Sequence, residues 1–169
     1  MASGVTRVIL RIEEAQETES LDLSECQLMQ VPDAVYHLMR NTELKSCDLS
    51  GNVITKIPPK FAVKFSLITE LNLSNNTMSK LPEELAELQE LEKLDISHNA
   101  FIALPTVCLR IPHLKRLLRY APQLEYLDLR SNPLTAKLHE QLTRLQEELP
   151  KLRIELTPRQ LEEWEDLTI

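Results

Sequence analysis

The stretch Leu71-Asn72-Leu73-Ser74-Asn75-Asn76 decides the fold, because the same six-residue pattern recurs four more times along the chain. The pattern is leucine, a polar residue, leucine again, and asparagine three positions later. Self-similarity of this kind is the signature of a repeat architecture. The other copies, each with at most minor changes, are Leu21–Cys26, Cys47–Asn52, Leu94–Asn99 and Leu127–Asn132.

Four copies also agree beyond the asparagine position. An apolar residue stands two positions on, another five positions on, and proline follows at the sixth, as in Met78, Leu81 and Pro82. The alternation within the motif predicts a short strand with its leucines on one face. Each asparagine amide is expected to bond backbone groups of the neighbouring turn. Proline ends strand pairing, and the leucines three apart in residues 82–91 predict a short outer helix.

These motifs resemble the leucine-rich repeat family over nearly all of residues 20–135. The outer segment Leu81-Pro82-Glu83-Glu84-Leu85-Ala86-Glu87-Leu88 is similar to the intracellular class found in Ras-associated and plant intracellular members. The resemblance implies an α/β fold, a leucine-rich repeat solenoid shaped as a short right-handed horseshoe, with parallel strands on the concave face and helical caps. The copy at 21–26 and the closing segment 129–134 also resemble one vertebrate member, which implies a small intracellular protein with no established chemistry.

Apolar stripes outside the repeats predict the caps. We expect an N-terminal cap over residues 1–19, where Val5, Val8, Ile9 and Ile12 have helical spacing. After the repeats of residues 20–135, we expect a helical cap and acidic tail over 136–169. Its first helix carries the stripe of leucines at 138, 142, 145 and 149. A second helix start at residues 157–160 leads to the single tryptophan, Trp164.

One repeat is shortened. The corner residues at 26, 52, 76, 99 and 132 are separated by 26, 24, 23 and 33 residues, and the last interval is too short for two units. The lead-in motif Pro112–Leu117 matches Pro122–Leu127, but only the second continues into a strand motif. The sequence therefore predicts an irregular repeat at about 106–126, with strand 94–96 pairing directly with strand 127–129.

Composition excludes several classes of function. With 26 acidic and 19 basic side chains, a net charge of −7 and 4% aromatic residues, the 169-residue chain lacks the profile of a nucleic-acid binder. Its two glycines, Gly4 and Gly51, cannot form a glycine-rich phosphate loop. The sequence predicts neither a nucleic-acid partner nor a cofactor.

The cysteines and the first residues predict a cytoplasmic protein. Cys26, Cys47 and Cys108 are odd in number and form no C-x-x-C pair, which is typical of a reducing compartment. We expect Cys26 and Cys47 to be small buried residues. The apolar run near the start, 8–10, is too short for a signal peptide or a membrane span, so no membrane partner is predicted.

Three groups of residues could carry chemistry, and each has a simpler interpretation. Asp95, Ser97 and His98 contain the residue types of a catalytic triad, but they occupy ordinary variable positions of the repeat. The four histidines are dispersed, which argues against a zinc site. The basic stretch 110–119 could bind a phosphate or an acidic partner, although a solvated convex surface is favoured. We expect no enzyme activity and no metal.

The concave face is the candidate site. Its polar residues form three columns across the strands, and strands about 4.8 Å apart would let the carboxylates reinforce one another. The functional hypothesis is an acidic trough for a basic protein surface, and the alternative is a solvated filler pattern. Five short strands offer less than the roughly 800 Å² of a standard interface, so rims or caps must contribute. The candidate residues, each on a strand or directly after it, are Asp22, Ser24, Asp48, Ser50, Glu70, Asn72, Ser74, Lys93, Asp95, Ser97, Tyr126, Asp128 and Arg130.

The sequence therefore predicts a non-enzymatic protein–protein interaction module that binds a partner with a basic surface through the concave face and its rims. A second hypothesis rests on analogy between folds alone. It makes the chain a regulatory subunit or scaffold of a phosphatase, small-GTPase or ubiquitin-ligase complex. The sequence predicts no particular oligomeric state.

Overall fold

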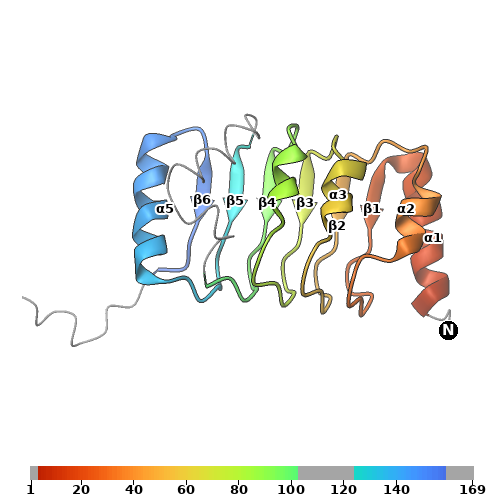
Figure 1. The fold of residues 1–169 in the computed structure, drawn as a ribbon, viewed down its shortest axis with the longest axis horizontal. Helices are drawn as coiled ribbons and strands as arrows, with labels where there is room; N and C mark the ends of the chain where they lie inside the picture. Colours follow the sequence, from red (N-terminus) through yellow and green to blue (C-terminus); the bar gives the residue numbers. More distant parts are fainter. Residues whose placement is uncertain (1–3, 103–123, 159–169) are drawn as a thin grey trace, which may run out of the picture.

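The repeats stack into one row of short parallel strands, with helices and turns on the outer side (Figure 1). The computed structural model describes residues 4–102 and 124–158. The strands are β1 (Ser20–Asp22), β2 (Ser46–Asp48), β3 (Glu70–Asn72), β4 (Lys93–Asp95), β5 (Tyr126–Asp128) and β6 (Arg153–Glu155). The helices are α1 (Gly4–Thr18), α2 (Asp33–Leu38), α3 (Pro59–Lys64), the 3₁₀ turn η1 (Glu83–Glu87) and α5 (Ala136–Glu148).

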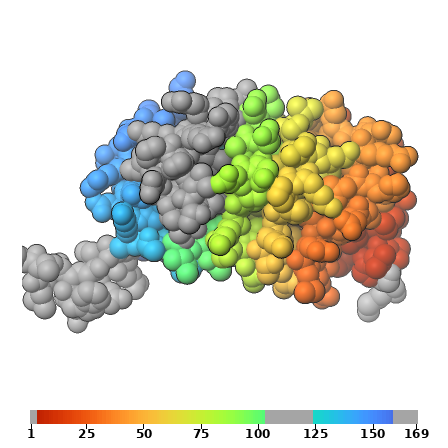
Figure 2. Space-filling view, viewed as in Figure 1, coloured from red at the N-terminus to blue at the C-terminus, as the bar shows by residue number. Residues whose placement is uncertain are grey.

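All six strands pair in parallel and in chain order. The first apolar residue of each motif stands opposite the first apolar residue of the motif on the next strand, as Leu71 stands opposite Leu94. The strands begin one residue earlier than predicted, because the polar residue before each leucine also joins the ladder. The space-filling view in Figure 2 shows the segments following one another in chain order along the long axis.

The core is a continuous column of repeat side chains. Both apolar strand residues of each motif are buried, including Cys47 and Ile96 where these replace leucine, and Phe61 and Phe101 are among the largest fully buried side chains. The outer elements α2, α3 and η1 each follow a proline in extended conformation, namely Pro32, Pro58 and Pro82. The outer helix predicted within residues 82–91 is the single 3₁₀ turn η1.

The corner asparagines connect neighbouring repeats, as predicted. The Asn52 side-chain oxygen accepts the N–H groups of Cys26 and Leu28 at 3.0 Å, and its amide donates to Leu23 O at 3.0 Å and Leu49 O at 2.8 Å. One side chain thereby satisfies backbone groups of two repeats. The same arrangement recurs at Asn76, Asn99 and Asn132.

The two predicted apolar stripes lie on helices at opposite ends of the row (Figure 1). In α1, Val8 and Ile12 are buried, whereas Val5 is 74% exposed. In α5, the leucines at 138, 142 and 145 are buried, and the Thr135 side chain caps the helix by accepting the Leu138 N–H. Strand β6 after α5 was not predicted.

The prediction for the shortened repeat is confirmed at the strands: β4 pairs directly with β5, Leu94 opposite Leu127. Residues 103–123, with Cys108, the basic stretch and the motif Pro112–Leu117, lie outside the described residues. So does the tail from residue 159, with Trp164.

Candidate functional site

The strand register brings the predicted residues into the expected columns. Ser20 pairs with Ser46, and the leading column continues through Glu70, Lys93 and Tyr126. The second column runs through Asp22, Asp48, Asn72, Asp95 and Asp128. The third column follows each strand by two residues and contains Ser24, Ser50, Ser74, Ser97 and Arg130. The sixth strand extends the face with Arg153 and Glu155, which sequence reasoning missed.

Each acid or amide of the second column holds the turn after its strand. The Asp48 Oδ1 atom accepts the Ser50 N–H at 2.9 Å, and the Asp95 Oδ1 atom accepts the Ser97 N–H at 3.0 Å. At the equivalent place the Asn72 oxygen accepts the Ser74 N–H at 3.0 Å. The column therefore has a structural role that needs an oxygen acceptor but no negative charge.

Four of the carboxylates on this face have cationic partners, including Glu155 of β6, which pairs with Arg153. Arg11 of α1 lies 3.5 Å from Asp22, Lys93 lies 3.3 Å from Glu70, and Arg130 lies 2.7 Å from Asp128. Within residues 4–102 and 124–158, neither Asp48 nor Asp95 has a cation within 4.0 Å. The uncompensated negative charge of the face is therefore concentrated on β2 and β4.

Asp128 does not line an open trough. Its side chain is 2% exposed, and it accepts hydrogen bonds from Arg130 Nε at 3.1 Å and from the Tyr126 hydroxyl at 3.3 Å. Burial raises the pKa of Asp128, but the hydrogen bonds from Arg130 outweigh it and place this pKa below its ordinary value. Burial and the neighbouring Asp128 charge raise the pKa of Tyr126. The acidic surface is thus shorter than predicted, because the negative charge of the β5 carboxylate is compensated by Arg130, two residues after it.

The hydroxyl of Ser97 already donates a hydrogen bond to a neighbouring carboxylate. Ser97 is 4% exposed, and its Oγ donates to Asp95 Oδ1 at 2.6 Å. A nucleophilic serine instead needs its hydroxyl on a general base such as histidine. His98 is exposed and lies in a left-handed turn, where its N–H donates to Arg130 O. The geometry gives these residues a turn-forming role.

The cysteines of the described part of the chain lie in the core. Cys47 is 1% exposed and Cys26 is 8% exposed, as predicted, and both are free thiols. Burial raises the pKa of Cys47. Among residues 4–102 and 124–158, no three histidine, cysteine or acidic side chains are grouped to hold a metal ion. None of the helices in that part is long and apolar enough to cross a membrane.

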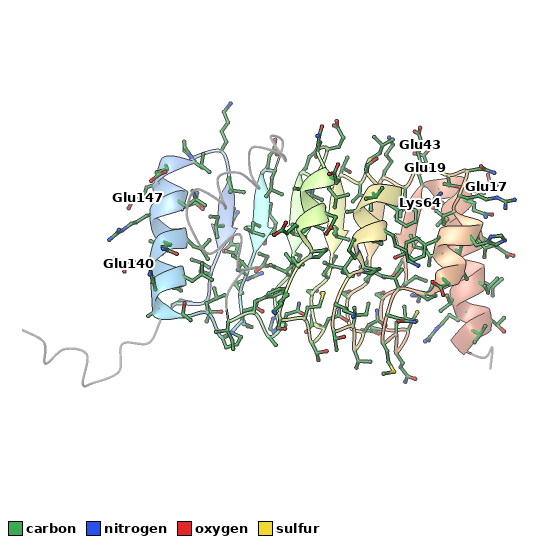
Figure 3. All side chains as sticks on the ribbon, in the orientation of Figure 1. Glu17, Glu19, Glu43, Lys64, Glu140 and Glu147 are labelled. Carbon is green, nitrogen blue, oxygen red and sulfur yellow. The ribbon has the colours of Figure 1, made fainter. Side chains whose placement is uncertain are left out.

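A shallow groove lies on one rim, between the segments that follow α2 and α3. Its lining includes Leu67, which is 36% exposed, over the buried Leu44 and Phe65, and Lys64 donates to Arg40 O at 3.2 Å beside them. Figure 3 labels Lys64 together with Glu43, which also lines the groove. The groove lies at the rim, which the predicted interface needs in addition to the strands.

Comparisons with known proteins agree with this fold. A family described as "Leucine rich repeat" matches residues 42–101, and a second, "Leucine Rich Repeat", matches residues 123–145. Human leucine-rich repeat-containing protein 20 is 33% identical over 96 residues, which cover 54% of this chain and 52% of that protein. This is the vertebrate member whose motifs the chain resembles. The chain spans about half the length of this relative.

Two solved structures show the same solenoid. Internalin C2 of Listeria monocytogenes superimposes with a TM-score of 0.56 and 23% identity, over 82% of this chain and 51% of the other. A chain of the Drosophila Toll–Spatzle complex superimposes with a TM-score of 0.57 and 20% identity, over 75% of this chain and 16% of the other. At these identities the likeness concerns the fold.

Proposed function

This chain is a leucine-rich repeat protein, and we propose that it is a non-enzymatic module that binds a protein with a basic surface through β1–β4 and the adjoining rim. Leucine-rich repeat domains generally mediate protein–protein interaction. The proposal includes a cytoplasmic location, with neither nucleic acid nor membrane as the partner. The solenoid supplies a rigid surface, so little ordering entropy opposes binding.

The observation that carries the proposal is the position of the two uncompensated acids. Asp48 and Asp95 each use Oδ1 for the turn, and both side chains are partly exposed. The second- and third-column neighbours of these acids are short and uncharged: Ser50, Asn72, Ser74 and Ser97. The charged pair Lys93–Glu70 stands in the leading column, where Lys93 is bonded to Glu70 at 3.3 Å. A lysine or arginine of a partner can therefore approach each carboxylate without displacing a cation bound to it.

The test separates charge from turn formation. Because Asn72 forms the same turn with an amide oxygen, Asp48→Asn with Asp95→Asn removes two charges and keeps both hydrogen-bond acceptors. Replacement by lysine would lose those acceptors, so asparagine is the better choice. The matched control is Glu83→Gln with Glu87→Gln, two exposed acids on the outer turn η1.

The measurement is affinity capture from cytosol, followed by binding of the captured partner at increasing salt. We expect the control to retain the partner and the asparagine variant to lose most of its affinity, since each desolvated charged contact contributes about 1–3 kcal/mol. Salt should weaken the parent complex more than any residual variant complex. Equal capture by the asparagine variant would remove the proposal. Co-purification of a phosphatase, GTPase or ubiquitin-ligase subunit would give support to the scaffold hypothesis.

A further inference from the structure

The groove on the rim that precedes β2 and β3 carries a positive charge to which the binding of a basic surface gives no role. The groove has a volume of about 320 Å³ and is formed by residues 40–44, which follow α2, and by residues 64–67, from the last residue of α3 onward. Two cations, Arg40 and Lys64, and one acid, Glu43, line it. Because a basic partner surface is repelled by the two cations, the groove fits a ligand group of negative charge.

Neither cation of the groove is paired with a carboxylate. Within residues 4–102 and 124–158, no acidic side chain lies within 4.0 Å of Arg40 or of Lys64. Lys64 donates to the carbonyl oxygen of Arg40 at 3.2 Å, which uses one of its three donors. Glu43 has a cation of its own, since its Oε2 atom lies 3.9 Å from Lys45 Nζ. The chain as a whole carries a charge of −7, but screening within about 8 Å makes the nearby charges decisive.

Neutral hydrogen-bond donors accompany the two cations. Asn41, Thr42 and Ser66 line the groove, and their side chains have no hydrogen-bond partner in the part of the chain that the structure describes. A guanidinium, an ammonium, an amide and two hydroxyls are groups that bind phosphate oxygens. A phosphate monoester offers three acceptor oxygens and a charge of about −1.5 to −2, so it uses more of these donors than a carboxylate does.

The position of the groove favours a phosphate group that is attached to a protein. Sites for free small molecules enclose most of the ligand surface, which a shallow groove on a rim cannot do. Residues 40–44 lead directly into β2, at whose end lies the uncompensated Asp48. At about 3.3 Å per extended residue, the four residues from Leu44 to Asp48 span roughly 13 Å. One extended segment of a partner, also about four residues long, can therefore reach from the groove to Asp48.

We propose that the groove binds a phosphorylated serine or threonine of the protein partner, about four residues away from a lysine or arginine that Asp48 binds. The inference rests on the proposed function for the basic residue alone, because the phosphate is held by Arg40, Lys64 and the neutral donors. A phosphate gains charge-assisted hydrogen bonds that the unmodified hydroxyl lacks. Phosphorylation of the partner then strengthens its binding to this chain.

The first experiment tests the phosphate site without a partner. N-acetyl-phosphoserine amide is added to the isotope-labelled chain, with N-acetyl-serine amide as its unphosphorylated counterpart, and the backbone amides are followed by NMR. We expect saturable shifts within residues 40–44 and 64–67 for the phosphorylated probe only. Arg40→Gln with Lys64→Gln should abolish them. Groove amides that do not shift in the parent, or that still shift after the loss of both cations, overturn the proposal.

Two further variants separate a specific site from general attraction by charge, and their amide spectra also report whether each one is folded. Lys56→Gln with Lys80→Gln removes two exposed cations outside the lining and should leave the affinity for the probe unchanged. Thr42→Val with Ser66→Ala keeps both cations of the groove and removes two hydroxyl donors, and it should weaken binding about tenfold. A probe that responds to every loss of a cation and to no loss of a hydroxyl binds by charge alone, which overturns the proposal.

The second experiment tests the source of the phosphate with peptides that carry a lysine four residues from a phosphoserine, in either order. We expect phosphorylation to tighten binding about tenfold or more in one of the two orders, and the Arg40→Gln, Lys64→Gln variant to lose that gain. No gain from phosphorylation in either order overturns the proposal. So does groove-dependent binding to phosphatidylserine vesicles without such a gain, because it assigns the phosphate to a lipid.

The same peptides distinguish this inference from the proposed function on which its basic residue depends. In Asp48→Asn with Asp95→Asn, replacing the peptide lysine by alanine should no longer matter, while the gain from phosphorylation remains. A gain from phosphorylation with no effect of the lysine in the parent supports the phosphate site and contradicts the proposed function. An effect of the lysine without a gain from phosphorylation supports the proposed function and overturns the inference.

Discussion

Asp128 and Asp48 occupy the same position of their repeats, yet the charge of Asp128 is compensated by a neighbouring cation and that of Asp48 is not. The carboxylate of Asp128 is buried between the guanidinium of Arg130 and the hydroxyl of Tyr126. The carboxylate of Asp48 is partly exposed and, within the described part of the chain, accepts a hydrogen bond from the N–H of Ser50 alone. The residue two positions later decides the difference, because an arginine there can fold back onto the acid and a serine cannot reach both oxygens.

The first prediction is a pH dependence of stability that comes from Asp128. Because Arg130 lowers the pKa of Asp128 below the 3.8 of an exposed carboxyl, this group stabilises the fold above its unfolded pKa. That stability is lost as the pH falls through the folded pKa. Asp128→Asn keeps an acceptor for the Arg130 N–H, and it should flatten the fall in unfolding free energy between about pH 5 and pH 2. Urea unfolding at a series of pH values measures the unfolding free energy of the parent and of the variant. Equal acid slopes would contradict the assignment.

At the scale of the element, the turn after each strand depends on a left-handed residue before the corner position. These residues all have φ between 51° and 66°: Glu25, Gly51, Asn75, His98 and Ser131. Of these five residues, Gly51 alone is a glycine, the residue type that adopts a positive φ without strain. The Gly51 position is also crowded, since a Cβ there would stand 2.9 Å from Glu25 Cγ.

The second prediction is that glycine and alanine substitutions in these turns have opposite effects. His98→Gly relieves a left-handed strain of about 1–2 kcal/mol, partly offset by greater freedom of the unfolded chain, and should stabilise by about 0.5–1 kcal/mol. Gly51→Ala introduces both the strain and the close contact, and should destabilise by about 1 kcal/mol or more. Denaturant unfolding measures the change in unfolding free energy for each of the two variants. Changes of the same sign in the two variants would show that the turns do not govern stability in this way.

The repeat elements were predictable because their signals are local and recur. The alternation in Leu71-Asn72-Leu73 predicts a strand and its buried face, and five equal copies predict the register. The ion pair of Asp128 with Arg130 also had a signal, since Arg130 lies two residues on and can fold back onto the acid. No sequence signal indicated that Arg11 would bond to the carbonyls of Asp22 and Ser24. Nor did one indicate that the Gln146 amide would bond to Leu152 O and the Ile154 N–H. Both contacts depend on how a cap helix meets the edge of a strand. Strand β6 was missed because Leu152-Arg153-Ile154 alternates but lacks a corner asparagine.

At the scale of the whole molecule, each repeat contacts its neighbours in the row, as the strand order shows. Stability in such a solenoid is approximately a sum of repeat and interface terms, so the ends open first unless they are capped. Here the first repeat lacks the corner asparagine and has Cys26 in its place. Arg11 supplies part of what is missing, because its guanidinium reaches the carbonyls of Asp22 and Ser24 and lies 3.6 Å from the Cys26 sulfur.

The third prediction follows from this capping role. Arg11→Ala leaves two carbonyls without their charged donor, and should destabilise the first repeat by about 1–3 kcal/mol. Because coupling passes from neighbour to neighbour, hydrogen exchange should accelerate most at the N–H groups of Leu23 and Glu25, which bond to β2 and its turn, and least at Ile96. Arg144→Ala is the control, since that guanidinium pairs with exposed Glu140 within α5. Uniform acceleration along the chain would mean that the solenoid opens as one unit, and that Arg11 stabilises the whole fold and not its first repeat.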